Sequence, residues 1–219
     1  MERQALLRQV AAAILELPAA EVLRVAVDGV DGAGKTHFAD ELAHALQPSG
    51  RPLIRASVDG FHNPRAVRYR RGRGSPEGFF RDSYDYAKLK EVLLDPLSPG
   101  GSRRFRRAAF DHANDAPVEA PLEEALSGSI LIFDGIFLHR PELRGYWDYS
   151  VFLEVGFEVS IPRGAQRGPG YGSPDPHAES NRRYVEGQKL YLSECNPKAH
   201  ASVVINNENL ADPYFVAGD

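Results

Sequence analysis

Cysteine is almost absent from this chain of 219 residues, which contains only Cys195. One thiol excludes an internal disulfide and a multi-cysteine zinc site, and it favours a reducing, cytoplasmic setting. Long apolar runs are also missing, so the sequence predicts no helix that crosses a bilayer. Residues 1–21 place the short apolar stretch Ala-Ala-Ala-Ile-Leu among acids and bases. This mixture predicts an amphipathic helix rather than a secretory signal.

Lysine is scarce as well, with five lysines against 21 arginines at a net charge of −4. The arginines gather in two clusters, at residues 65–73 and 103–107. Because a guanidinium presents a planar fork of donors, these clusters indicate binding of phosphate or carboxylate groups, and a solvated surface is an equal alternative. Phe105 lies within the second cluster, but the acidic balance and the lack of a recognisable reading module disfavour a nucleic-acid partner.

Apolar residues make up 42% of the chain, which is enough for one core, so residues 1–219 are expected to form a single domain. Short β-branched and apolar runs predict strands, and apolar residues at helical spacing predict helices between them. The expected strands cover 22–28, 52–58, 129–133, 149–155 and 202–205, and the expected helices include 35–46, 85–94 and 179–192. This alternation predicts an α/β fold of three layers, a parallel sheet with helices on both faces.

Two segments, 60–81 and 163–176, do not follow the alternation, and both are rich in glycine, proline and arginine. Loops of this length in a compact domain act as functional lids or are disordered, so 163–176 is expected to form a lid. Between the two segments, residues 104–110 alternate arginines with apolar residues, which predicts a small β-hairpin laid over the sheet. Residues 60–120 are therefore expected to form an insertion.

A glycine-rich motif directly follows the first expected strand. Gly29-Val30-Asp31-Gly32-Ala33-Gly34-Lys35-Thr36 has the spacing of a phosphate-binding P-loop (Walker A), and a predicted helix begins at its end. The backbone of Gly29, Asp31, Gly32, Ala33 and Gly34 is expected to curl around phosphate oxygens at the positive end of that helix. Lys35 is expected to reach the β- and γ-phosphates of ATP, and the Thr36 hydroxyl to hold Mg²⁺. The motif thus predicts a P-loop NTPase fold.

Two acids stand at the ends of expected strands, and functional groups gather beyond the carboxyl ends of parallel strands. Asp134, after the very apolar strand 129–133, is expected to hold Mg²⁺ directly or through water. Asp59, after strand 52–58, is expected to lie near the γ-phosphate and to accept the proton of an attacking hydroxyl. The alternative for either acid is that it caps the following turn or helix.

With these motifs, the chain resembles the uridine kinase and phosphoribulokinase family of P-loop kinases, which also includes pantothenate kinase-like enzymes. The resemblance rests on the P-loop, on Ser-Val-Asp-Gly-Phe-His at 57–62, on Phe-Asp-Gly-Ile-Phe at 133–137, and on the segments 183–191 and 203–207. It implies that Asp59 is the catalytic base and that Arg163 and Arg167 close over the phosphates as a lid. Such arginines would neutralise charge on the transferred phosphoryl group while closure excludes water.

The chain departs from this family where the phosphoryl acceptor is expected to bind, in the insertion 60–120. Uridine kinases carry an Asn-Phe-Asp-His-Pro stretch whose Asp holds the sugar hydroxyls, whereas this chain has Arg-Gly-Ser-Pro-Glu at 73–77. Arginines facing the pocket would favour an acceptor that carries a carboxylate or a phosphate. For Asp111 and His112, capping of a hairpin turn is an equal alternative. The acceptor-side candidates are His62, Arg65, Tyr69, Asp111, His112 and Arg183.

The sequence therefore predicts an ATP- and Mg²⁺-dependent kinase that transfers the γ-phosphoryl group to a hydroxyl of a small metabolite, with a uridine-like nucleoside favoured by the resemblance. An anionic acceptor such as pantothenate, glycerate or a sugar phosphate is the alternative. A non-kinase NTPase or a regulatory nucleotide-binding protein is less favoured. The Asn-Lys-x-Asp segment of GTPases and the Ser-Gly-Gly-Gln signature of ABC ATPases are both missing. A homo-oligomer is compatible with the sequence, and no membrane partner is expected.

Overall fold

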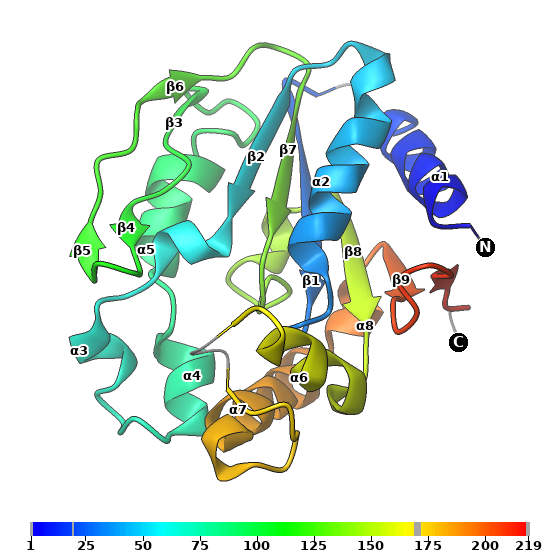
Figure 1. Cartoon of the computed structure of the whole chain (residues 1–219). Coiled ribbons are helices and arrows are strands. Elements are labelled where there is room, and N and C mark those ends of the chain that lie inside the picture. The colour runs from blue at the N-terminus through cyan, green and yellow to red at the C-terminus, as the bar shows by residue number, and fades with distance from the viewer. Residues whose placement is uncertain (1, 19, 169–171, 218–219) are drawn as a thin grey trace.

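The computed structural model describes residues 2–18, 20–168 and 172–217. At its centre lies a sheet of six strands: β1 (Val22–Gly29), β2 (Leu53–Ser57), β7 (Ser129–Asp134), β8 (Tyr149–Glu154), β9 (Val203–Asn206) and β10 (Tyr214–Phe215). Their order across the sheet is β10-β9-β8-β1-β7-β2 (Figure 1). All neighbouring pairs are parallel except β10 and β9. The expected parallel sheet is thus confirmed, with one short antiparallel strand added at its edge.

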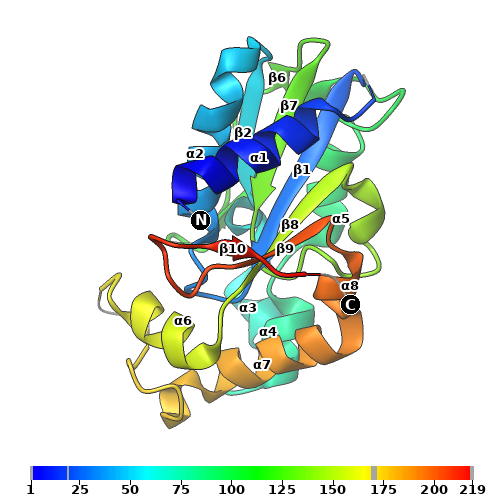
Figure 2. The same ribbon diagram turned by 90° about the vertical axis from the view of Figure 1, so that its right-hand side faces the viewer.

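Helices cover both faces of this sheet (Figures 1 and 2). On one face, α1 (Arg3–Leu15) and α2 (Lys35–Leu46) share an apolar core with β1, β7 and β8. On the other face, a second core joins the sheet to α4 (Pro76–Asp82), α5 (Tyr86–Leu89) and α7 (Glu179–Cys195). The two cores stay separate because successive side chains of a strand point to opposite faces. The expected three-layer α/β arrangement is therefore confirmed.

Segment 60–81 is partly helical, although the sequence predicted an irregular loop. The 3-10 turn Val58–Phe61 leads into α3 (Arg65–Arg68), and α4 follows. Ser75 Oγ accepts a hydrogen bond from the Gly78 N–H (3.0 Å), and Pro76 occupies the first position of α4. A serine N-cap followed by proline is a common helix start, so the prediction of an irregular loop was wrong for residues 76–81.

The hairpin of the insertion lies later in the chain than predicted. β4 (Phe110–Asp111) pairs with β5 (Ala116–Pro117), whereas β3 (Arg104–Phe105) pairs with the more distant β6 (Glu123–Glu124). Residues 104–110 therefore do not fold back on themselves, because each half of this segment pairs with a later one. The expected helix over 85–94 consists of α5 and a π-helical turn at Lys90–Leu94.

The expected lid begins within a helix. α6 (Phe157–Ala165) follows β8 and runs through Pro162, so that Arg163 lies in its last turn. Residues 169–171 of the expected lid lie outside the described residues. Farther along, α8 (Pro197–His200) connects α7 to β9. Within the described ranges, no helix has the length and apolar character needed to span a bilayer.

The carboxyl ends of β1, β2 and β7 meet at one edge of the sheet. Both β1 and β7 are buried along their whole length, as expected for strands covered on two faces. Their register places Val27 opposite Asp134, and that of β2 places Ser57 opposite the same residue. Figure 1 shows α3, α4, α6 and α7 near this edge. The segments that follow the three strands therefore share one region of the molecule.

Candidate active site

The P-loop joins β1 to α2, and its conformation depends on its glycines. Gly32 and Gly34 have φ angles of 76° and 89°, in the left-handed region that L side chains rarely adopt. A Cβ atom on Gly32 would lie 2.0 Å from the carbonyl oxygen of Ser160 in α6. Only glycine therefore lets the loop pass this close to α6. Because Gly34 precedes the first residue of α2, no capping side chain covers the N-terminal amides of this helix, which suits a bound phosphate.

Side chains from α7 and from the segment after β9 hold the P-loop in place. The Asp31 N–H donates to Gln188 Oε1 (2.5 Å), and Asn207 Nδ2 donates to the carbonyl of Ala33 (2.7 Å). Gln188 and Asn207 are both buried. Lys35 Nζ donates back to a carbonyl of the same loop (2.8 Å). The Asp31 amide is thus bonded to α7, although the sequence predicted that it binds phosphate.

Thr36 and Asp134 are in direct contact, since Thr36 Oγ1 donates to Asp134 Oδ2 (2.9 Å). Arg55 of β2 donates to Asp134 Oδ1 (3.0 Å) and offsets part of the charge of this buried carboxylate. Mg²⁺ prefers oxygen ligands and completes its shell with substrate phosphates and water. A threonine hydroxyl beside a carboxylate therefore fits Mg²⁺. No cluster of three or more His, Cys, Asp or Glu side chains suited to a metal occurs in the described part of the chain.

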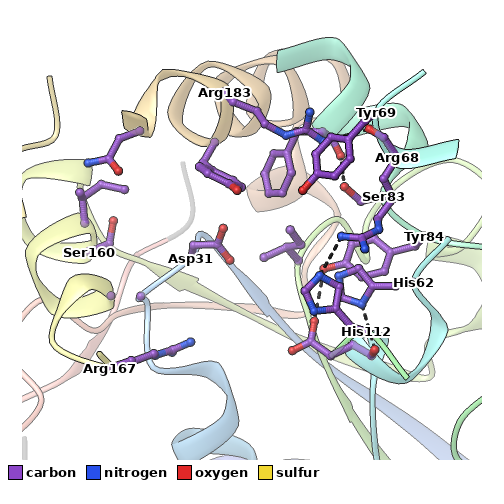
Figure 3. A pocket seen from close by; sticks show the side chains of 18 residues that line it. Asp31, His62, Arg68, Tyr69, Ser83, Tyr84, His112, Ser160, Arg167 and Arg183 are labelled. Carbon is purple, nitrogen blue, oxygen red and sulfur yellow. Dashed lines mark hydrogen bonds between the residues drawn. The ribbon is translucent and has the colours of Figure 1, made fainter. Parts of the chain in front are cut away.

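A cavity of about 480 Å³ opens beside the P-loop (Figure 3). Asp31 and Gly32 of the loop form part of its wall, and Asp59 also lines it. Asp59 lies in the 3-10 turn after β2, and Tyr84 OH donates a hydrogen bond to its Oδ1 (3.3 Å). The rest of the wall consists of His62, Arg68, Tyr69, Phe79, Ser83, Tyr84, His112, Ile136, Ser160, Ile161, Gly164, Arg167, Asn181, Arg183 and Tyr184.

Burial and neighbouring charges shift the pKa values of the titratable groups in this cavity. Burial raises the pKa of Asp31 against the attraction of Lys35, and the Asp59 carboxylate raises it further. Burial likewise raises the pKa of Asp59, against the attraction of Lys35 and the hydrogen bond from Tyr84. Solvent reaches the Asp59 side chain through the open cavity, but protein surrounds it closely enough to remove much of its hydration. Burial also lowers the pKa of His62 to about 4, so this ring is uncharged at neutral pH.

Four of the predicted acceptor-side residues line the cavity, namely His62, Tyr69, His112 and Arg183. The rings of His62 and His112 pack with their centroids 4.2 Å apart. Figure 3 shows both histidines on the wall opposite Asp31, with Tyr69 and Arg183 above. The insertion and α7 therefore contribute to the same cavity as the P-loop.

Arg65 and Asp111, which the sequence also proposed for the acceptor, lie outside the cavity lining. The Arg65 side chain is exposed, and its backbone N–H donates to Asp115 Oδ1 (2.9 Å). The Asp111 carboxylate accepts hydrogen bonds from the backbone N–H groups of Ala113 and Asn114 (2.9 and 3.2 Å). Asp111 thus caps the turn between β4 and β5, which is the alternative role that the sequence left open.

The two arginines expected in the lid occupy different positions. Arg167 lines the cavity (Figure 3). Arg163 instead donates to the backbone carbonyls of Gly32, Asn207 and Glu208 (3.4, 3.3 and 2.8 Å) and joins α6 to the P-loop and to the segment after β9. Residues four apart share a face only within a helix, and α6 ends at Ala165, before Arg167. The resemblance implies that both arginines close over the phosphates, but of the two only Arg167 lines the cavity.

Several wall residues were not found from the sequence. Arg68 is buried, and its guanidinium contacts His112 Nε2 (2.8 Å) and Asp115 Oδ1 (3.2 Å) of the β4–β5 hairpin. No local pattern distinguishes Arg68 from the exposed arginines near it, because its burial depends on that distant hairpin. Tyr84 was missed for the same reason, since it lies in a segment without a motif. Tyr184 was missed although it follows Arg183 in the segment 183–191 that carries the resemblance.

A second polar group, also missed, lies in the interior at the end of β1. His139 Nδ1 is 2.7 Å from Asp28 Oδ2, and its Nε2 is 3.0 Å from Ser150 Oγ. Tyr191 OH donates to the same Asp28 oxygen, and all four residues are buried. The order Asp–His–Ser is that of a nucleophilic triad, but a serine with 3% of its surface exposed cannot meet a substrate. This network therefore joins β1, β8 and α7 and has a structural role.

The parallel sheet, the P-loop between β1 and α2, and the two acids at the carboxyl ends of β2 and β7 define the class of the molecule, which is a P-loop nucleotide-binding fold. Comparison with solved structures gives closely similar chains. A protein described as a possible uridine kinase from Bacillus stearothermophilus matches with a TM-score of 0.74 and 24% identity, covering 93% of this chain and 99% of that one.

Two other solved structures extend this comparison. A proposed fructose transport system kinase from a Silicibacter species has a TM-score of 0.68 and 24% identity, covering 88% of this chain and 95% of that one. Phosphoribulokinase from Rhodobacter spheroides has a TM-score of 0.57 and 14% identity, covering 85% and 70%. Neither the models of known protein families nor the curated proteins give a match. These likenesses show that the chain has the fold of uridine kinase- and phosphoribulokinase-type P-loop proteins.

Proposed function

We propose that this protein is a kinase that transfers the γ-phosphoryl group of ATP to a hydroxyl of a small metabolite. The observation that carries the proposal is that the P-loop and Asp59 open onto one cavity of about 480 Å³, a volume suited to a small molecule. Hydrolysis by water needs no room for a second small molecule, so a cavity that joins the phosphate loop to Asp59 favours transfer to an acceptor.

The role that we propose for each residue is based on its position in the site. Lys35 and the loop amides hold the phosphates, and Thr36 with Asp134 holds Mg²⁺, which neutralises phosphate charge. Asp59 accepts the proton of the attacking hydroxyl, and its raised pKa makes it a stronger base. Arg167 offsets the charge that develops on the transferred group, with residues 163–176 as the lid that excludes water. Arg163 is a positioning residue, because it holds α6 against the P-loop.

A uridine-like nucleoside is the acceptor that the sequence resemblance favours. Two structural neighbours are described as a possible uridine kinase and a proposed fructose transport system kinase, and uridine and fructose are both neutral compounds with several hydroxyl groups. The aromatic and imidazole rings of Tyr69, His62 and His112 offer flat surfaces and ring nitrogens for such a ligand. The segment 60–120 supplies these three residues and is proposed as the acceptor-side insertion.

Replacement of the base tests this proposal. In Asp59→Asn, acceptor-dependent ADP release should fall by at least about 10²-fold, because the amide cannot take the proton. Binding of ATP and Mg²⁺, measured by calorimetry, should stay within about twofold, since Asp59 stands on the acceptor side. Glu91→Gln is the matched control, because Glu91 is an exposed acid whose one ion pair within the described ranges is with Lys88. Turnover of Asp59→Asn at the wild-type rate would remove Asp59 from the mechanism.

A further inference from the structure

Except for Arg183 Nε, the guanidinium nitrogens of the two buried arginines in the cavity, Arg68 and Arg183, already contact other groups of the protein. Arg68 donates to the carbonyl of Asn63 (2.8 Å) and contacts His112 and Asp115 with its other two nitrogens. Arg183 donates to the carbonyls of residues 72 and 73 with Nη1 and to that of residue 68 with Nη2. An ionised ligand group would have to displace these contacts. The presence of arginines in the wall therefore does not make this an anion site.

In the upper part of the cavity, aromatic rings form a surface that packs against the guanidinium group of Arg183. Its guanidinium carbon lies 4.8 Å from the ring centroid of Tyr69 and 5.8 Å from that of Phe79, and Tyr184 completes this surface. Two buried polar atoms of wall residues, Arg183 Nε and Ser160 Oγ, have no hydrogen-bond partner within the described part of the chain. Unpaired buried polar atoms cost free energy unless a ligand or water pairs them. The cavity is thus suited to a ligand with an apolar face and several polar groups.

Asp31 supplies a hydrogen-bond acceptor on the loop side of the cavity. Its amide is fixed to Gln188 of α7, and Figure 3 shows its side chain between Ser160 and Arg167 on one side and Tyr84, His62 and His112 on the other. Among the described residues, no hydrogen bond or ion pair to this carboxylate is formed. Lys35, Asp59 and Arg167 act on it electrostatically, and burial raises its pKa. An acceptor atom without a donor in this position suits a ligand hydroxyl.

We infer that Asp31, although it belongs to the phosphate loop, is a specificity-determining residue for the acceptor, and that it accepts a hydrogen bond from a second hydroxyl of a neutral polyhydroxylated compound. The attacking hydroxyl of that compound lies at Asp59, and its apolar face lies on Tyr69, Phe79 and Tyr184. Asp31 and Asp59 repel a carboxylate or phosphate placed beside them, while the guanidinium groups of Arg68 and Arg183 are held by hydrogen bonds to the protein. The inference rests on the proposed kinase function and narrows it to neutral acceptors with at least two hydroxyls.

The test starts with acceptor-dependent ADP release on matched compounds. The neutral probes are uridine, D-ribose, D-fructose and glycerol, and the anionic ones are D-glycerate, pantothenate and ribose 5-phosphate. We expect turnover with a neutral probe, and we expect Asp31→Asn to raise its KM at least about tenfold, as a lost hydrogen bond to a charged group does. The KM for ATP should change by less than about twofold, because the Asp31 amide and side chain do not hold phosphate in this assignment.

Deoxy analogues of the probe that reacts then identify the hydroxyl. Removal of one hydroxyl other than the attacking one should raise KM for the wild type by a factor similar to that of Asp31→Asn. The same removal should have little further effect in the variant, because the two changes delete one interaction. Glu186→Gln, an exposed acid of α7 outside the cavity, is the control for a lost charge. Thermal unfolding of each variant verifies that it is folded.

The possible negative results separate a failure of the proposed kinase function from a failure of the role inferred for Asp31. If none of the probes, neutral or anionic, stimulates ADP release, the proposed function and the inference are both overturned. If a neutral probe reacts equally well with wild type and Asp31→Asn, or if only an anionic probe reacts, the inference alone is overturned. A selective rise in the KM for ATP in Asp31→Asn would also overturn it, because Asp31 would then serve the nucleotide.

Discussion

At the scale of single residues, opposing effects set the pKa of Asp59. Desolvation in the cavity wall raises this pKa, whereas the attraction of Lys35 and the hydrogen bond from Tyr84 lower it. A carboxylate acts as a base only when it is ionised, so the activity of the proposed kinase should fall as the pH drops through this raised pKa. Tyr84 therefore helps to set the acid limit of activity without itself taking a proton.

Tyr84→Phe tests this coupling. Loss of the hydroxyl removes a donor that stabilises the ionised form, so the pKa of Asp59 should rise further. We expect the acid limb of the kcat/KM profile to move to higher pH by about half a unit, in keeping with one weak hydrogen bond. Tyr86→Phe is a matched control, because the Tyr86 hydroxyl is also buried but does not act on the pKa of Asp59. Equal acid limbs for Tyr84→Phe and wild type would contradict this coupling.

At the scale of elements, the P-loop and α6 are fitted to each other through their backbones. Gly32 leaves no room for a side chain beside the Ser160 carbonyl, and Arg163 of α6 donates to the carbonyl of Gly32. The nucleotide loop and the start of the proposed lid are therefore in contact before any ligand binds. A change in the position of one element requires a change in the other.

Gly32→Ala should disturb both elements. The new methyl group meets backbone rather than a flexible side chain, so we expect the free energy of unfolding to fall by about 1–3 kcal/mol. ATP affinity should fall at least about tenfold, because the loop must shift from its phosphate-binding form. The control Gly145→Ala meets nothing within 4 Å and should change stability by less than about 0.5 kcal/mol. Urea unfolding and calorimetry measure the two effects, and unchanged ATP affinity in Gly32→Ala would disprove this fit.

At the scale of the whole molecule, the buried network of Asp28, His139, Ser150 and Tyr191 connects the sheet to α7. Tyr191 OH donates to Asp28 and accepts a hydrogen bond from the His139 N–H (3.0 Å). Asp28 in turn accepts from the N–H of Gly29, the first residue of the P-loop motif (2.7 Å). The position of the loop is therefore tied to a helix that packs on the opposite face from α2.

Tyr191→Phe leaves a buried carboxylate and a buried amide short of one partner each. We expect a loss of about 1–3 kcal/mol in the free energy of unfolding, the usual cost of an unsatisfied buried polar group. Tyr214→Phe, at a position of β10 that is 52% exposed, should stay within about 0.5 kcal/mol of the wild type. Urea denaturation measures both variants, and equal stabilities would show that the network does not support the fold.

The parts of the structure that sequence predicts well are those set by local chemistry. The helix over 35–46 was predicted at its observed bounds, because the glycines of the loop start it and Pro48 follows its end. Whether a residue lines the cavity depends on contacts between distant segments. The sequence therefore could not distinguish the buried Arg68 from the exposed arginines near it. The start of α4 at Ser75 and Pro76 did carry a local signal, which the abundance of glycine and arginine around it obscured.

The order of the strands has a further consequence for the proposed reaction. Because β7 lies between β1 and β2, the strand tips that carry the P-loop and Asp59 stand two interstrand spacings apart, about 9–10 Å. A nucleotide anchored at the first tip has to extend its phosphate chain across this gap before its terminal phosphorus comes within reach of the acid at the second. For the proposed reaction, this strand order therefore calls for a nucleotide whose phosphate chain extends from the P-loop to Asp59.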